Sequence, residues 1–117
     1  MADTLLNDFK ISNAATEIPI ATVANGSNKH TIISVSLCNI STTTTHTFRM
    51  YVQDVGGTHL TANDAVYIYI DQTLPPKSTF IHSDKIIMES QERLVFTIDT
   101  GGSATDVHIN CSYLKQD

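Results

Sequence analysis

The sequence predicts an all-β fold, a single-domain antiparallel β-sandwich of jelly-roll type with seven or eight short strands. Short segments of alternating polarity recur along the 117 residues. Turn-forming residues separate these segments at intervals of about 8–12 residues, which is typical of sandwiches. After residue 16 no segment has helical periodicity, and no internal repeat is evident. A chain of this length suits one domain whose core needs neither a metal nor a disulfide.

The first fifteen residues stand apart from this pattern. Their apolar residues lie in a polar context, with no strand pattern next to them in the sequence. We expect either a short helix or an extended arm that packs on a neighbouring subunit, with residues 16–117 forming the sandwich domain and residues 1–15 the arm. The candidate interface residues of the arm are Leu5, Leu6, Phe9 and Ile11.

The expected strands follow in order after residue 16. The first is interrupted by Pro19, which suits a sheet edge because proline cannot donate a backbone hydrogen bond. A later segment alternates most clearly, with Phe48, Met50 and Val52 on one face. The expected strands lie at 17–23, 29–38, 46–54, 65–71, 78–82, 85–89, 92–99 and 105–114.

Turn signals separate these strands. The Asn-Gly pair at 25–26 favours a turn because both residues tolerate a positive φ. Gly-Gly at 56–57 follows the clearly alternating strand, and Pro-Pro at 75–76 cannot join a sheet ladder. Gly-Gly-Ser at 101–103 supplies the return into the last strand. Each predicted strand is therefore bounded by residues that end it.

The charge balance argues against two classes of partner. Twelve acidic and seven basic residues give a net charge of −5, and the basic residues are scattered rather than clustered. Binding along a nucleic-acid backbone needs clustered lysines and arginines, so we expect no nucleic-acid partner. No apolar run approaches the ~20 residues of a membrane helix. The N-terminus lacks the features of a signal peptide, so we expect a soluble chain made in a cytoplasm.

Charged residues make up only 16% of the chain, and there are sixteen threonines. Threonine favours strands, and surfaces poor in charge suit contacts with other proteins. Threonine is also common on the solvent faces of sandwiches, so composition leaves both interpretations open.

The two cysteines are expected to be reduced thiols. In the strand at 31–39 the apolar face is formed by Ile33, Val35 and Leu37, which places Cys38 on the opposite face. In the last strand Cys111 shares the apolar face. One thiol then points toward the core and the other away from it, and a disulfide cannot bridge them without movement of the backbone.

The one motif that suggests catalysis is Asp99-Thr100-Gly101, which follows an apolar strand as in aspartic proteases. That mechanism needs two such carboxylates sharing a proton, here from a dimer. In those proteases, however, the motif lies in the first third of the chain, and here only fourteen residues follow Ser103. We interpret the motif as a hairpin turn and expect no catalytic residue.

No metal or cofactor site is expected. The five histidines show no close ligand spacing, although residues on distant strands, such as His82 and His108, could converge. Several aspartates fall near predicted strand ends, where carboxylates often cap turns. A calcium site would need several of them to converge in the fold.

Tyr67 and Tyr69 alternate with aliphatic residues and are expected on one aromatic face of their strand. On the outer face they would form a pair suited to a subunit contact. Otherwise they pack under the N-terminal arm.

Several segments together carry a resemblance to a family. The strand end Val35-Ser36-Leu37-Cys38-Asn39 is followed by a Ser/Thr-rich turn at 41–45. A later strand ends in Tyr-Ile-Asp at 69–71, and Leu-Pro-Pro-Lys-Ser-Thr at 74–79 precedes an isoleucine-rich strand. Over residues 16–114 this pattern resembles the small β-sandwich virion structural proteins of tailed bacteriophages.

The resemblance implies a non-enzymatic protein of the virion, assembled in the host cytoplasm without a cofactor. The favoured role is a capsid-decoration (cement) protein that forms a homo-oligomer, preferably a trimer, and contacts the major capsid protein. A neck, tail or baseplate accessory protein contacting neck or tail components is one alternative. A receptor- or glycan-binding module of a tail fibre is another, although the chain lacks the tryptophan common in such modules.

Overall fold

A computed structural model describes residues 3–12, 17–26, 29–99, 103 and 105–116 of the chain. All regular secondary structure in these residues is β-strand. The described residues form no helix long and apolar enough to cross a membrane. The strands are β1 Asp3–Ile11, β2 Ile18–Ile20, β3 Lys29–Asn39, β4 His46–Asp54, β5 Asp64–Leu74, β6 Thr79–His82, β7 Ile86–Met88, β8 Glu92–Ile98 and β9 Val107–Gln116.

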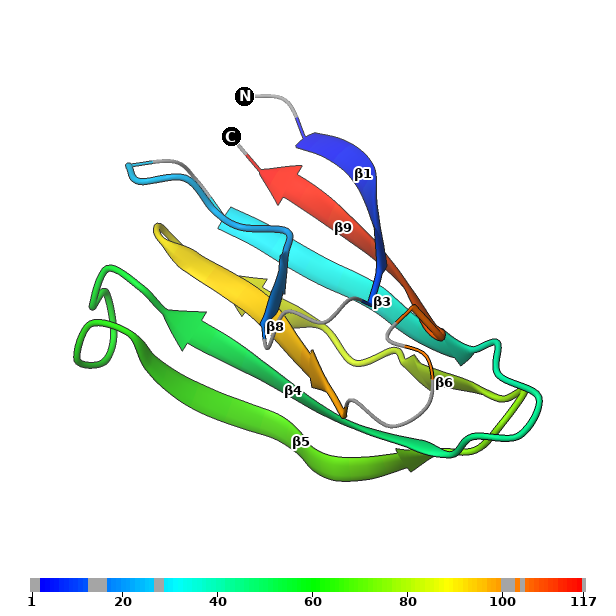
Figure 1. Cartoon of the computed structure of the whole chain (residues 1–117). Coiled ribbons are helices and arrows are strands. Elements are labelled where there is room, and N and C mark those ends of the chain that lie inside the picture. Colours follow the sequence, from blue (N-terminus) through cyan, green and yellow to red (C-terminus); the bar gives the residue numbers. More distant parts are fainter. Residues whose placement is uncertain (1–2, 13–16, 27–28, 100–102, 104, 117) are drawn as a thin grey trace.

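The strands form two antiparallel sheets that face each other (Figure 1). The first sheet has the order β1-β9-β3-β6, and β7 pairs with β3 beside β6. The second sheet has the order β2-β8-β4-β5. The prediction of an all-β sandwich is confirmed. Pro19 lies in the short edge strand β2, where its missing backbone donor breaks no ladder.

The core lies between the sheets and is built from alternate residues of facing strands. Phe48, Met50 and Phe96 of the second sheet are at most 1% exposed, as are Ile32, Val35 and Leu37 of the first. Rings from both sheets meet there, because the centroid of Phe48 lies 5.0 Å from that of Phe80 on β6. The predicted apolar face of the strand at 46–54 is therefore confirmed.

One prediction for β3 is wrong in part. Val35 and Leu37 face the core as expected, but Ile33 is 37% exposed and Ile32 is fully buried in its place. The register of β3 against β9 shifts between Ile32 and Ser34, which marks a β-bulge. A bulge adds one residue to a strand and so reverses the face of every residue beyond it.

The expectation for the cysteines is confirmed. Cys111 is buried in the core and Cys38 is half-buried on the other side of the first sheet, and both are free thiols. Burial raises the pKa of the Cys111 thiol to about 12, with a smaller contribution from Asp8. Cys111 is therefore protonated and unreactive at neutral pH.

The N-terminal segment is extended, and the alternative of a short helix is wrong. β1 pairs with β9 of its own chain along its whole length, from Asp3 opposite Gln116 to Ile11 opposite His108. No local pattern indicates this pairing, because β9 lies at the other end of the chain. The division of the chain at residue 15 into an arm and a sandwich stays a prediction.

Candidate interaction surface

The side of the first sheet that faces away from the core is formed by five strands. Because neighbouring residues of a strand point to opposite faces, the residues paired with one another across the strands define this surface. We call it the first sheet's outer face, and its residues are Asp3, Leu5, Asn7, Phe9, Ile11, Lys29, Thr31, Ile33, Ser34, Ser36, Cys38, Thr79, Ile81, Ile87, His108, Asn110, Ser112, Leu114 and Gln116.

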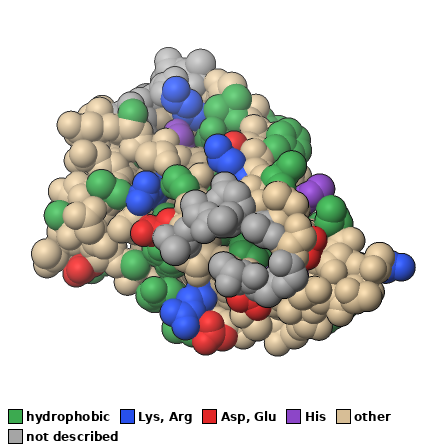
Figure 2. Space-filling view, in the orientation of Figure 1, with side chains coloured by type: hydrophobic (Ala, Val, Ile, Leu, Met, Phe, Trp, Pro, Cys, Tyr) green, Lys and Arg blue, Asp and Glu red, His purple; other side chains and the backbone are tan. Residues whose placement is uncertain are grey.

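Large apolar side chains on this face are open to solvent. Phe9 is 70% exposed, Ile81 64% and Ile87 62%. Leu5 and Ile11 are also more than half exposed. Figure 2 shows hydrophobic side chains along the upper right margin of the molecule, the side on which Figure 1 draws β1. Exposed apolar patches mark contact sites in soluble proteins.

The same face carries few charged side chains. Asp3 and Lys29, one acid and one base, lie at one end of it opposite Gln116. Its other polar residues are Ser, Thr, Asn, one Cys and one His, so the net charge of −5 is carried by other parts of the chain. Depletion of charge at the centre of a surface is typical of protein–protein interfaces.

A groove of about 420 Å³ crosses this face. Phe9 and Ile11 form one side of it, and Ser36 and Cys38 lie across β9 on the other. Asn110 lies between them, and its Oδ1 atom is buried without a hydrogen-bond partner. An unpartnered buried acceptor is unfavourable, and a donor that reaches it removes that cost. The other lining residues are Lys10, His108 and Ile109.

The structure brings three of the predicted interface residues together and separates the others. Leu5, Phe9 and Ile11 share the first sheet's outer face. Leu6 lies on the opposite side of β1, opposite Tyr113, and is half-buried. Whether these residues contact another protein stays a prediction.

Tyr67 and Tyr69 do not share a face, contrary to expectation. Tyr69 is opposite Met50, while Tyr67 is opposite Tyr51, so one extra residue of β5 lies between the two pairs. Tyr69 points inward, where its hydroxyl lies 2.8 Å from His82 Nδ1 and its ring contacts Phe80. Tyr67 points outward, 45% exposed, with its ring 4.9 Å from that of Tyr51. A β-bulge thus divides the expected aromatic pair.

A buried histidine joins three strand ends at one end of the sandwich. His46, at the start of β4, is 1% exposed. Its Nδ1 lies 2.6 Å from Asp99 Oδ1, and its Nε2 lies 2.9 Å from Asp106 Oδ2. Burial alone would lower the pKa of His46, but the hydrogen bonds with Asp106 and Asp99 outweigh it and raise the pKa above 6.5. A protonated imidazole can donate to both carboxylates.

This arrangement predicts that stability falls as the pH rises above 6.5. The folded pKa of His46 is raised, so its contribution is complete below pH 6.5 and is lost as the pH rises through the folded pKa. We expect the free energy of unfolding of the wild type to fall over that range in urea titrations. Glutamine does not titrate, so the free energy of unfolding of His46→Gln should not show the decrease that comes from deprotonation of His46. Equal pH dependence in the two proteins would contradict the assignment.

The carboxylate of the Asp-Thr-Gly motif belongs to the same arrangement. Asp99 Oδ2 accepts a hydrogen bond from the backbone N–H of Thr47 at 3.0 Å, and Oδ1 contacts His46. Both oxygens thus hold β4 against the end of β8. Residues 100–102 lie outside the described residues, and so does most of the predicted turn. Asp99 thus makes a structural contact between the end of β8 and the start of β4.

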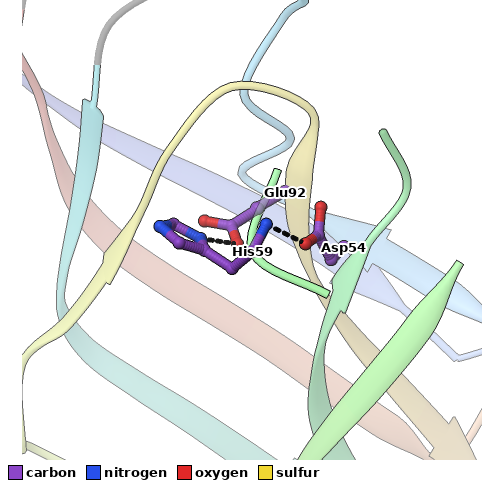
Figure 3. A group of neighbouring side chains, drawn as sticks. All are labelled: Asp54, His59 and Glu92. Carbon is purple, nitrogen blue, oxygen red and sulfur yellow. Dashed lines mark hydrogen bonds and ion pairs between the residues drawn. The ribbon is translucent and has the colours of Figure 1, made fainter. Parts of the chain in front are cut away.

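A second cluster lies at the other end of β4. Asp54, His59 and Glu92 each place a potential metal-binding atom within 4.8 Å of the others (Figure 3). His59 Nδ1 lies 2.9 Å from Glu92 Oε2, and His59 Nε2 lies 2.7 Å from Glu89 Oε2. The hydrogen bond with Glu92 chiefly raises the pKa of His59, which favours the imidazolium form. A histidine in that form repels a metal ion.

The carboxylates of this cluster are also occupied. Asp54 accepts backbone hydrogen bonds from Thr58 at 2.8 Å, His59 at 2.6 Å and Leu60 at 2.7 Å. Burial would raise the pKa of Asp54, but these bonds outweigh it and lower the pKa. Glu92 Oε1 accepts from the backbone of Glu89 at 2.6 Å. The cluster therefore closes the loop after β4, as expected for carboxylates near strand ends.

The chain is thus a two-sheet sandwich whose outer face exposes large apolar side chains and few charges. No family model matches the sequence, and no curated protein matches it. Solved structures share the fold. One is from the T13 viral particle of infectious bursal disease virus, with a TM-score of 0.54 and 8% identity, and the match covers 96% of this chain and 30% of that one.

A second similar structure is the VP2 subviral particle of infectious bursal disease virus. Its TM-score is 0.51 at 10% identity, over 97% of this chain and 32% of that one. The chain thus spans about a third of the viral chains that it matches. At these identities the likeness establishes a common sandwich fold.

Proposed function

We propose that this chain is a non-enzymatic structural protein of a virus particle. The observation that carries the proposal is the first sheet's outer face, which exposes large apolar side chains and carries only Asp3 and Lys29 as charged residues, both at one end. Such a surface suits burial against protein. The sandwich fold shared with chains from a viral particle supports the same role.

Within that role we propose a capsid-decoration protein of a tailed bacteriophage, acting as a homo-oligomer with a trimer favoured. Many copies on a closed shell would contact the major capsid protein and one another. Each contact can be weak, because linked contacts raise the effective concentration of the next one and so strengthen the whole lattice. The rigidity of the two-sheet core suits this role, since a clamp must hold its contact residues in fixed positions.

The decoration role predicts a weaker shell when the chain is missing. Particles assembled without it should form, yet release their genome at a lower temperature than particles that carry it, in a heat-release assay followed by dye binding to nucleic acid. Adding back the purified chain should restore the release temperature. Shells with an unchanged release temperature, together with a failure to join tails, would instead favour a neck or tail accessory role.

A further inference from the structure

We infer that the first sheet's outer face is the surface on which further copies of this chain dock, so that the same face of each copy meets around a symmetry axis. This inference rests on the assembly role proposed above and names the partner and the surface. It concerns the purified chain alone, so it can be tested without particles.

Exposed apolar side chains lie along both margins of the face. Phe9 on β1, Ile81 on β6 and Ile87 on β7 are each at least 62% exposed, and they lie on strands at the two margins of the sheet. The strands between them, β9 and β3, carry mainly polar side chains on this face. Burial of exposed apolar surface is the main driving force of association.

The charge balance of the face favours a copy of the same chain as its occupant. Copies that meet around a symmetry axis bring the same surface of each subunit close together, so like charges on that surface oppose the contact. This face carries one acid and one base, Asp3 and Lys29, at one end, although the chain carries −5 overall. A partner that binds through many charged residues would find few complementary charges here.

The polar groups of the face also suit a contact between copies. Ser, Thr and Asn side chains both donate and accept hydrogen bonds, so two copies of one patch can satisfy each other. Asn110 Oδ1 is buried without a partner in the single chain. A second copy that covers the groove brings hydroxyl and amide donors to the margin of the groove. Apolar side chains of that copy then contact the apolar residues that line the groove.

The test compares two isoleucines that are equally exposed on different sheets. Ile87 on the outer face is 62% exposed, and Ile70 on β5 is 61% exposed. Sedimentation equilibrium of the full-length wild type over a wide concentration range should show a dimer or trimer. Ile87→Asp places like charges around the symmetry axis and should raise the dissociation constant at least about tenfold. Ile70→Asp should leave it within about twofold of the wild type.

Cys38 gives an independent readout of the same face, since it lies on the wall of the groove. Its alkylation by iodoacetamide should slow as the wild-type concentration rises, and it should stay fast in Ile87→Asp. Cys111 is buried and should stay unmodified in both. Thermal unfolding of the two variants confirms that each remains folded.

Three results would overturn the inference. The wild type could remain monomeric at every concentration, or Ile70→Asp could dissociate the oligomer while Ile87→Asp does not. An oligomer that leaves Cys38 alkylation unchanged would form through another surface. If a monomeric wild type still binds particles and Ile87→Asp does not, the face binds a different virion protein. In that case the proposed function stands and the inference fails.

Discussion

Replacing Phe48 by alanine should lower the free energy of unfolding by about 3–5 kcal/mol. Phe48 is 1% exposed in the middle of the core, and its ring lies 5.0 Å from that of Phe80 and 6.1 Å from that of Tyr69. Truncation removes its apolar contacts with the facing sheet and leaves a cavity that the rigid sheets fill only in part. Urea denaturation measures the change.

Phe9→Ala is the matched control, because Phe9 is 70% exposed and truncation leaves no cavity. It should change the free energy of unfolding by no more than about 0.5 kcal/mol. The measurements should be made at the lowest practicable concentration, since self-association would add to apparent stability. Similar losses for the two variants would contradict the packing described for the core.

Replacing His46 by alanine should lower the free energy of unfolding by about 3 kcal/mol at neutral pH. The substitution removes the partner of two carboxylates. The side chain of Asp106 is only 12% exposed, so it would stay in the protein with an uncompensated charge. Removal of one partner of a buried ion pair is much more costly than the pair itself is stabilising.

His59→Ala provides the comparison, because His59 also contacts two carboxylates but its side chain is 55% exposed. Solvent screens an exposed ion pair, so this variant should be much less destabilised than His46→Ala. If the two substitutions lowered the free energy of unfolding equally in urea denaturation, burial of the His46 cluster would not determine its contribution to stability.

Local patterns in the sequence were sufficient for most of the strands. The strand expected at 46–54 has the observed bounds of β4, and its alternation identified Phe48 and Met50 as core residues. β5 continues past its expected end at residue 71 and stops at Leu74, directly before the two prolines that cannot join a ladder. Alternation and turn chemistry are properties of neighbouring residues, so they can be read from sequence.

The bulges could not be predicted in this way. One extra residue in β3 moves Ile33 out of the core, and one in β5 places Tyr67 and Tyr69 on opposite faces. Asp71 in β5 has a φ of 50°, although it is not a glycine. Nothing in the sequence around Asp71 predicts this positive φ. Alternation counted along a strand is correct only up to the first bulge.

The candidate surface depended on long-range pairing. Leu5, Phe9 and Ile11 were recognised as candidate interface residues, but Ile81 and Ile87 were missed because each lies in a short strand with little pattern. The serines at 34 and 36 gave the available signal, since they showed that one side of β3 faces away from the core. Only the pairing of β3 with β9, β6 and β7 assembles these residues into one face.

The copy number of the chain on purified particles tests the assembly role most directly. Quantitative mass spectrometry of gradient-purified particles, with labelled peptides as standards, measures it against the major capsid protein. The structural role predicts that the chain co-purifies in a fixed whole-number ratio set by the symmetry of the shell or tail. Absence of the chain from purified particles, or a trace amount that varies between preparations, would contradict that role.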